Sequence, residues 1–190
     1  MAKATHNGTC QCCGSIQKLP NGVLSKHGYT VDYGWFNGTC KGAGHKPFEE
    51  STDLIDNLIE LAQQRIDELN SQVNLLQEST DATDVWKHSY ASHRHPTRPS
   101  GYFWEKKAII KKVRESDGYE YWSWDDGKDS YSVNNNLGPC ESISLEGIIK
   151  KENGKYVDKL QKETNQTKHY IIWQRERCVN WKPQPLLEIK

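Results

Sequence analysis

Apolar residues are scarce in this sequence. Hydrophobic residues make up 35% of its 190 positions, with one Met and three Phe, and the mean hydropathy is −0.87. This is too little apolar material for one large buried core, so we expect small cores joined by a connector. The sequence also lacks a run of roughly 20 apolar residues, as needed to span a bilayer, and a secretory leader at its start. We therefore expect a cytoplasmic protein with no membrane contact.

Net charge is missing as well. Lys and Arg together number 25, and so do Asp and Glu, which removes the simple argument that a globally basic protein seeks nucleic acid. The charges are nevertheless unevenly distributed. Residues 49–79 hold eight acidic residues and one Arg, whereas residues 86–114 hold eight basic residues and one Glu. The neutral total therefore conceals an acidic stretch followed by a basic one.

The six cysteines indicate a metal site. Cys12 and Cys13 are adjacent and a cytoplasmic chain is kept reduced, which disfavours disulfides. The tetrapeptide Asn-Gly-Thr-Cys occurs at 7–10 and again at 37–40, each time followed by a glycine-containing turn. Such a turn lets a thiolate and nearby backbone N–H groups face one tetrahedral ion. Residues 1–48 are therefore predicted to form a zinc-ribbon or zinc-knuckle head around one structural Zn²⁺.

Three cysteines and one histidine form the expected ligand set. Cys10 and Cys13 have the spacing of one knuckle, and Cys40 opens a second knuckle that lacks another cysteine. The fourth ligand is then a histidine. We favour His27, which follows an Asn-Gly turn that suggests a hairpin, over His45, which lies five residues after Cys40.

The sequence shows no residue pattern typical of a catalytic site. A catalytic zinc needs an open coordination position and a neighbouring acid or base, and Asp32 is the only carboxylate before Glu49. The sequence also has no Ser-nucleophile elbow, phosphate-binding glycine loop or dinucleotide fingerprint. We therefore expect a protein that is not an enzyme, with Cys12 as a spare thiol, and keep a zinc-dependent enzyme as the second alternative.

The N-terminal motifs also resemble a known group of proteins. These motifs are Cys-Gln-Cys-Cys-Gly at 10–14, Asn-Gly-Val-Leu at 21–24, His-Gly-Tyr at 27–29, Gly-Trp at 34–35 and Gly-Thr-Cys-Lys-Gly-Ala-Gly-His-Lys-Pro-Phe-Glu at 38–49. Together with Trp-Lys-Pro-Gln-Pro-Leu at 181–186, they are similar to uncharacterised small phage and prophage proteins that have a zinc-ribbon head followed by a long helix. The resemblance covers the first third and the last tenth of the chain. It implies a mobile-element origin and carries over only the metal-ligand positions.

Residues 49–79 are predicted to form a long helix with a heptad seam. Apolar residues recur at alternating steps of four and three positions, as in coiled coils. The seam consists of Ile55, Ile59, Ala62, Ile66, Leu69, Val73 and Leu76. A more basic helical pattern over 155–181 offers a partner within the chain. We favour this intrachain helical hairpin over a coiled-coil homodimer through 49–79.

Residues 80–150 are predicted to form a small antiparallel sheet rich in aromatic residues. The β-prone runs are 102–104, 108–113, 119–124 and 130–133, with an extension over 142–150 before a turn at Gly154. Aromatic residues interleave with the basic stretch, which can stack bases and pair phosphates but is equally typical of the core of a small sheet. The candidate nucleic-acid or partner contacts are Arg94, Arg98, Trp104, Lys106, Lys107, Lys111 and Lys112.

The expected architecture is α+β. It comprises a zinc-binding head (1–48), a long heptad helix (49–79), an antiparallel β-sheet region with a basic loop (80–150), and a C-terminal helix with a Pro-rich tail (151–190). We expect a non-enzymatic zinc-binding accessory protein that binds a nucleic acid or a nucleoprotein complex. The resemblance to phage proteins further implies interference with a host process such as defence, in the host cytosol. The alternative is a coiled-coil adaptor that binds a host protein without nucleic-acid contact.

Overall fold

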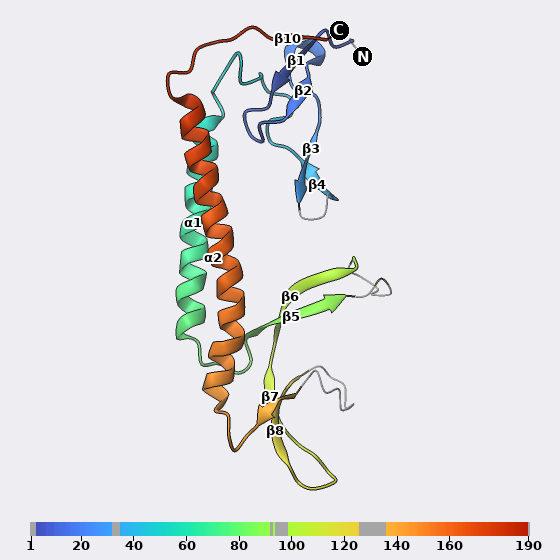
Figure 1. Cartoon of the computed structure of the whole chain (residues 1–190), viewed down its shortest axis with the longest axis vertical. Helices are drawn as coiled ribbons and strands as arrows, with labels where there is room; N and C mark the ends of the chain where they lie inside the picture. The colour runs from blue at the N-terminus through green and yellow to red at the C-terminus, as the bar shows by residue number, and fades with distance from the viewer. Residues whose placement is uncertain (1–2, 32–34, 92, 94–98, 126–135, 190) are drawn as a thin grey trace. The chain divides into compact units, whose positions relative to one another are not determined.

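The computed structural model describes residues 3–31, 35–91, 93, 99–125 and 136–189. The chain divides into two compact units, unit 1 (Met1–Arg65 with Thr167–Lys190) and unit 2 (Ile66–Gln166). Small antiparallel sheets and two helices make up the described chain (Figure 1), which confirms the expected α+β class. Within the described ranges, neither helix combines enough length and apolar character to cross a bilayer.

Unit 1 holds two small sheets. In the first, β1 (His6–Thr9) pairs antiparallel with both β2 (Ile16–Lys18) and β10 (Leu187–Glu188). In the second, β3 (Gly28–Val31) and β4 (Trp35–Thr39) form a hairpin, and a short 3-10 turn, η1 (Pro20–Gly22), precedes it. The pairing of β10 with β1 joins the two ends of the chain, where the sequence alone predicts only a Pro-rich tail.

The core of unit 1 is built partly from metal-ligand candidates. Cys10 and Cys40 are buried in one cluster with Leu19 and Leu24, and Leu186 from the C-terminal tail packs against it. A core this small cannot supply much hydrophobic stabilisation by itself. The head therefore depends on additional contacts from the helices and on its cysteine cluster.

Helix α1 (Ile55–Glu78) buries most of the predicted seam. It begins six residues after the expected start at residue 49, because residues 48–54 form turns that lead into it. The side chains of Ile55, Leu58, Ile66, Leu69 and Val73 are buried, and those of Ile59, Ala62 and Leu76 are half-buried. The sequence pattern therefore identifies the buried face, apart from the additional position Leu58.

Helix α2 (Leu145–Cys178) begins earlier than the sequence pattern indicates. The strand expected over 142–150 and the turn expected at Gly154 are wrong, because residues 145–178 are continuously helical. Two features explain the early start, a local cap and burial in the tertiary structure. The hydroxyl of Ser144 accepts a hydrogen bond from the backbone N–H of Gly147 at 3.1 Å, as in a helix N-cap. Ile148 and Ile149 then lie on the buried face of the helix.

Unit 2 contains two further sheets. β5 (Val85–Ala91) and β6 (Gly101–Lys107) form a two-stranded hairpin, and β7 (Ile109–Val113), β8 (Glu120–Trp124) and β9 (Asn136–Pro139) form a three-stranded meander. The antiparallel pairing and the turn before β8 agree with the sequence pattern, but the single sheet expected is divided in two, because β6 pairs with β5 and not with β7. The strand β5 is not predicted by it, and the run expected at 130–133 lies outside the described residues.

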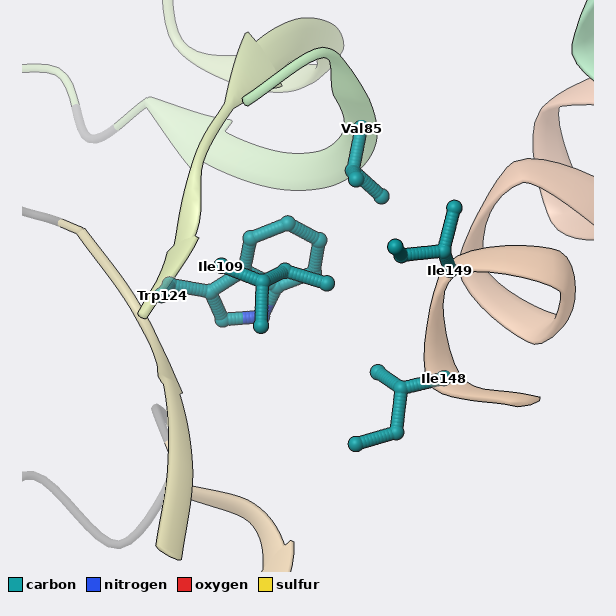
Figure 2. Packing of buried hydrophobic residues seen from close by; sticks show 5 residues of the cluster. All are labelled: Val85, Ile109, Trp124, Ile148 and Ile149. Atoms are coloured by element: carbon teal, nitrogen blue, oxygen red, sulfur yellow. The ribbon is translucent and has the colours of Figure 1, made fainter. Parts of the chain in front are cut away.

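A second hydrophobic core joins these strands to α2. Figure 2 shows Ile109 and Trp124, from paired strands β7 and β8, facing Ile148 and Ile149 of α2. Val85 of β5 completes the cluster, and all five side chains are at most 4% exposed. Burial of this kind stabilises by about 1.5–3 kcal/mol per large apolar side chain. The early start of α2 is therefore a tertiary effect, since its first turn carries two of the five core residues.

The two helices contact each other in unit 2. Leu69 and Val73 of α1 form a cluster with Val157 and Leu160 of α2, and all four side chains are at most 8% exposed. Figure 1 shows the helices side by side at this level. The C-terminal part of the predicted seam, at Leu69 and Val73, is therefore covered by the chain's own second helix.

Candidate metal centre

Four potential ligands, three at strand ends and one in the turn after β1, lie together in unit 1. The ligand atoms of Cys10, Cys13, His27 and Cys40 all lie within 4.8 Å of one another. Cys10 directly follows β1, His27 directly precedes β3, and Cys40 directly follows β4. Pairing of β3 with β4 brings His27 next to Cys40, and packing in one buried cluster brings Cys10 to Cys40, 30 positions away. The structure thus assembles the three cysteines and the histidine that the sequence favours.

Each buried cysteine opens a tight turn whose backbone points at its sulfur. The backbone N–H groups of Cys12 and Cys13 donate to the Cys10 sulfur, and the N–H of Gly42 donates to the Cys40 sulfur. The turns are closed by hydrogen bonds from Gly14 N to the Cys10 carbonyl at 3.0 Å and from Ala43 N to the Cys40 carbonyl, also at 3.0 Å. Such N–H donors stabilise thiolates and orient them toward a cation.

Glycine is required at the closest approach of the two turns. A Cβ atom added to Gly42 would collide with the Cys10 sulfur. Gly14 has a φ of +73°, in the left-handed region, and a Cβ there would lie 2.9 Å from the Trp173 ring. The glycines that follow both repeated tetrapeptides therefore have a steric role at the centre.

The imidazole of His27 is oriented with one nitrogen toward the sulfurs. Its Nδ1 lies 2.8 Å from the Ser25 carbonyl oxygen, which can only accept a hydrogen bond. Nδ1 therefore carries the proton, and the lone pair is on Nε2, which lies 3.5 Å from the Cys13 sulfur. The alternative ligand His45 is exposed and is not part of the cluster.

The thiols differ in acidity. Burial raises the pKa of Cys10 to about 12 and that of Cys40 to about 11. Burial also disfavours ionisation of Cys13, but hydrogen bonds from Ser15 and Cys10 outweigh it and lower its pKa to about 7. Two of the three thiols therefore remain protonated at neutral pH unless a cation displaces the protons. A cation among them would compensate for the burial of the thiolates.

Gln11, between the cysteines of the first turn, anchors this turn to the start of α1. Its side chain is fully buried. The amide oxygen accepts a hydrogen bond from Leu54 N at 3.0 Å, and the amide nitrogen donates to the Lys46 carbonyl at 2.9 Å and to Asp53 at 2.8 Å. One backbone N–H at the start of the helix is thereby satisfied. Sequence reasoning missed this residue, because a polar residue between two cysteines gives no signal of burial.

Side chains at the end of α2 donate hydrogen bonds to the backbone carbonyl groups of the same turn. Gln174 donates to the Gln11 carbonyl at 3.0 Å, and Tyr170 donates from its hydroxyl to the Cys12 carbonyl at 3.0 Å. Arg177 donates to the Gln11 carbonyl at 3.1 Å. Its guanidinium lies 4.0 Å from the Phe48 ring centroid and 4.3 Å from that of Trp173. The first turn is therefore fixed from both helices of unit 1.

Several of the predicted partner-binding residues already contact other side chains of unit 2. Lys106 forms an ion pair with Asp84 at 2.6 Å, and Lys111 forms one with Glu120 at 2.5 Å. Trp104 is half-buried, with its ring 4.6 Å from the His88 ring and 5.0 Å from the Tyr156 ring. Lys107 and Lys112 are half-buried on β6 and β7, whereas Arg94 and Arg98 lie outside the described residues.

Comparison with known proteins does not assign the chain to a family. No protein-family model, curated protein or solved structure matches the chain. What can be concluded is therefore set by the geometry of the centre itself: Cys10, Cys13, His27 and Cys40 form a cluster able to bind a metal ion.

Proposed function

We propose that the protein is a non-enzymatic accessory protein whose N-terminal head is held by one structural zinc ion. The observation that carries the proposal is the spacing of the ligand atoms. A tetrahedral zinc with Zn–S of about 2.3 Å and Zn–N of about 2.0–2.1 Å separates two sulfurs by about 3.8 Å and a sulfur from a nitrogen by about 3.6 Å. The Cys10 and Cys40 sulfurs are 3.8 Å apart, and the Cys13 sulfur and His27 Nε2 are 3.5 Å apart.

The donor set supports a structural role. Three thiolates and one imidazole complete a tetrahedron, so no position remains for a substrate or a water molecule. Carboxylates do not join the cluster within the described chain. The nearby Glu49 accepts hydrogen bonds from the Thr9 backbone and hydroxyl, and Asp53 accepts from Gln11 and Ser51. These acids organise the head, and a zinc-dependent enzyme is the least supported function.

We further propose that the partner is a nucleic acid or a nucleoprotein complex. The basic stretch 86–114 supports this, because eight Lys or Arg against one Glu attract a polyanion. If the chain comes from a phage, as its motifs suggest, the partner would belong to a host process such as defence, in the host cytosol.

A protein partner is the second candidate, and specific contacts favour it. Lys106 and Lys111 already pair with carboxylates, and the Trp104 ring lies between two other rings. These residues therefore stabilise unit 2 itself, and fewer of the predicted contacts remain for phosphates and bases. An adaptor of this kind would bind a host protein with little dependence on salt.

Two measurements test these proposals. Elemental analysis of protein purified without chelator should find one zinc per chain, and its absence would remove the structural-zinc proposal. Mobility-shift titration with single- and double-stranded probes at low salt should show binding that weakens steeply as salt is added. If neither probe binds at micromolar protein, the partner is a protein.

We also propose that α1 and α2 pair over more of their length than the cluster around Leu69 and Leu160 in unit 2. The buried residues Ile55 and Leu58 on α1, and Ile171 and Gln174 on α2, continue both seams into unit 1. An intrachain helical hairpin then accounts for the seam, in place of a coiled-coil homodimer. Light scattering of the full chain should give the mass of a monomer, whereas a dimer mass would favour intermolecular pairing through 49–79.

A further inference from the structure

The β5–β6 hairpin carries a continuous row of aromatic rings on one face. Side chains alternate across paired strands, so residues of the same parity share a face. Successive ring centroids are 4.0 Å apart for Trp86 and Tyr156, 5.0 Å for Tyr156 and Trp104, 4.6 Å for Trp104 and His88, 5.0 Å for His88 and Tyr102, and 5.1 Å for Tyr102 and Tyr90. The row therefore extends from α2 toward the end of the hairpin.

The two ends of this row differ in exposure. At the α2 end, Trp86 and Tyr156 stack on each other, and the backbone N–H of Trp86 donates to the buried Asn153 at 3.0 Å. At the other end, Tyr90 and Tyr102 are 59% and 72% exposed. Trp104 is half-buried between the His88 and Tyr156 rings, whereas Tyr102, which also contacts two rings, remains mostly exposed. The tyrosine end is therefore where a planar ligand can stack.

The charge of the hairpin selects the kind of planar ligand. Strands β5 and β6 carry three Lys and one Glu, and the sequence between the strands adds two Arg. Aromatic side chains next to a positive surface are typical of proteins that bind single-stranded nucleic acid, where bases stack on rings and phosphates are neutralised. Bases in a duplex are stacked on one another and do not offer their faces.

We propose that Tyr90 and Tyr102 form a stacking site for unpaired bases of single-stranded DNA or RNA. This inference rests on the nucleic-acid binding proposed above. It adds that the bound nucleic acid is single-stranded and that Tyr90 and Tyr102 contact its bases. The rest of the aromatic row has a positioning role. It packs the hairpin against α2 through Tyr156, so the two tyrosines are presented on strands that are already paired before binding, which lowers the ordering cost.

Fluorescence anisotropy with labelled oligonucleotides tests the assignment in the full chain. Tyr90→Leu and Tyr102→Leu keep an apolar side chain of similar reach but remove the aromatic face. Tyr119→Leu is the matched control, since Tyr119 is a partly exposed tyrosine near the turn before β8 in the same unit. Each of the first two variants should weaken binding to a single strand by about tenfold, and Tyr119→Leu should not. Thermal melts followed by circular dichroism confirm that each variant is folded.

The outcomes separate this inference from the function on which it rests. Wild-type binding to a single strand, lost in both tyrosine variants but retained by Tyr119→Leu, supports it. Parallel DNA and RNA strands show which sugar is preferred. Wild-type binding that the two variants leave unchanged, or equal binding to a duplex, overturns the stacking site while nucleic-acid binding stands. Absence of wild-type binding to every probe overturns both.

Discussion

The side-chain amide of Gln174, near the C-terminal end of α2, donates a hydrogen bond to the backbone carbonyl of Gln11 at 3.0 Å. Both residues are fully buried, and 163 positions separate them in the sequence. Gln11 lies between Cys10 and Cys13, two members of the candidate metal centre. The loop that presents the Cys10 sulfur is therefore positioned by the end of α2 as well as by its own turn.

Removing this contact should destabilise unit 1. Gln174→Ala removes one of the two donors to the Gln11 carbonyl, leaving Arg177, and also removes the bonds of Gln174 to Tyr170 and Arg177, so we expect a loss of about 1–3 kcal/mol in the free energy of unfolding. Urea denaturation followed by tryptophan fluorescence measures it. Gln161→Ala, at an exposed position of the same helix, is the control and should change stability by less than about 0.5 kcal/mol. Equal effects of the two variants would mean that the buried bond is not stabilising.

The cysteines of the cluster should differ sharply from Cys12 in their effect on metal content. Cys10→Ser or Cys40→Ser should abolish zinc binding, because each removes one of four ligands and leaves an open, weaker site. Cys12→Ser should retain one zinc per chain, since Cys12 is not a member of the cluster. Elemental analysis and a chelator-competition assay measure both. Loss of zinc in Cys12→Ser would show that the ligand set is misassigned.

Metal binding should release protons. At pH 7 in the metal-free protein, Cys10 and Cys40 are protonated because their pKa values are about 12 and 11, and Cys13 is about half ionised at its pKa of about 7. Binding a cation to three thiolates then releases between two and three protons, so the affinity should rise with pH and fall as the solution is acidified. Calorimetry in buffers of different ionisation enthalpy measures the number released. A pH-independent affinity would exclude coordination by these thiols.

Gly42→Ala should weaken the metal centre through sterics alone. The added Cβ would meet the Cys10 sulfur, so the two turns would have to separate. We expect a lower zinc affinity, measured by chelator competition. The control is Gly154→Ala inside α2, where a Cβ has open space, and there we expect a gain of about 0.4–1 kcal/mol in stability with unchanged zinc affinity. Unchanged affinity in Gly42→Ala would show that the turns approach less closely than described.

Packing between the helices should be visible in a pair of leucine variants. Leu69→Ala creates a cavity in the cluster with Val157 and Leu160, at an expected cost of about 2–5 kcal/mol. Leu75→Ala removes the same atoms at a position on α1 that is 67% exposed, and should cost less than about 0.5 kcal/mol. Thermal unfolding measures both. If Leu75→Ala proves as costly as Leu69→Ala and light scattering shows a dimer, the exposed face of α1 is an interface between chains.

Local patterns alone identified the three cysteines of the candidate metal centre and the buried face of α1. Cys10 and Cys13 share one turn, and Cys40 opens a turn of the same composition, so short-range geometry already points their sulfurs inward. The α1 seam is likewise visible because helix periodicity repeats over 24 residues. Both signals depend on spacing within a few residues, which a sequence displays directly.

Only the tertiary structure decided the remaining features, because each depends on residues far apart in the chain. His27 joins the cluster through the pairing of β3 with β4, whereas His45 stays outside the cluster although it is closer to Cys40 in sequence. Residues 145–150 are apolar enough for either a strand or a helix, and they are helical because Ile148 and Ile149 pack against Trp124. The contact of Gln174 with the Gln11 carbonyl, and the covering of the Trp104 ring by Tyr156, likewise arise only when α2 packs against segments that no local pattern connects to it.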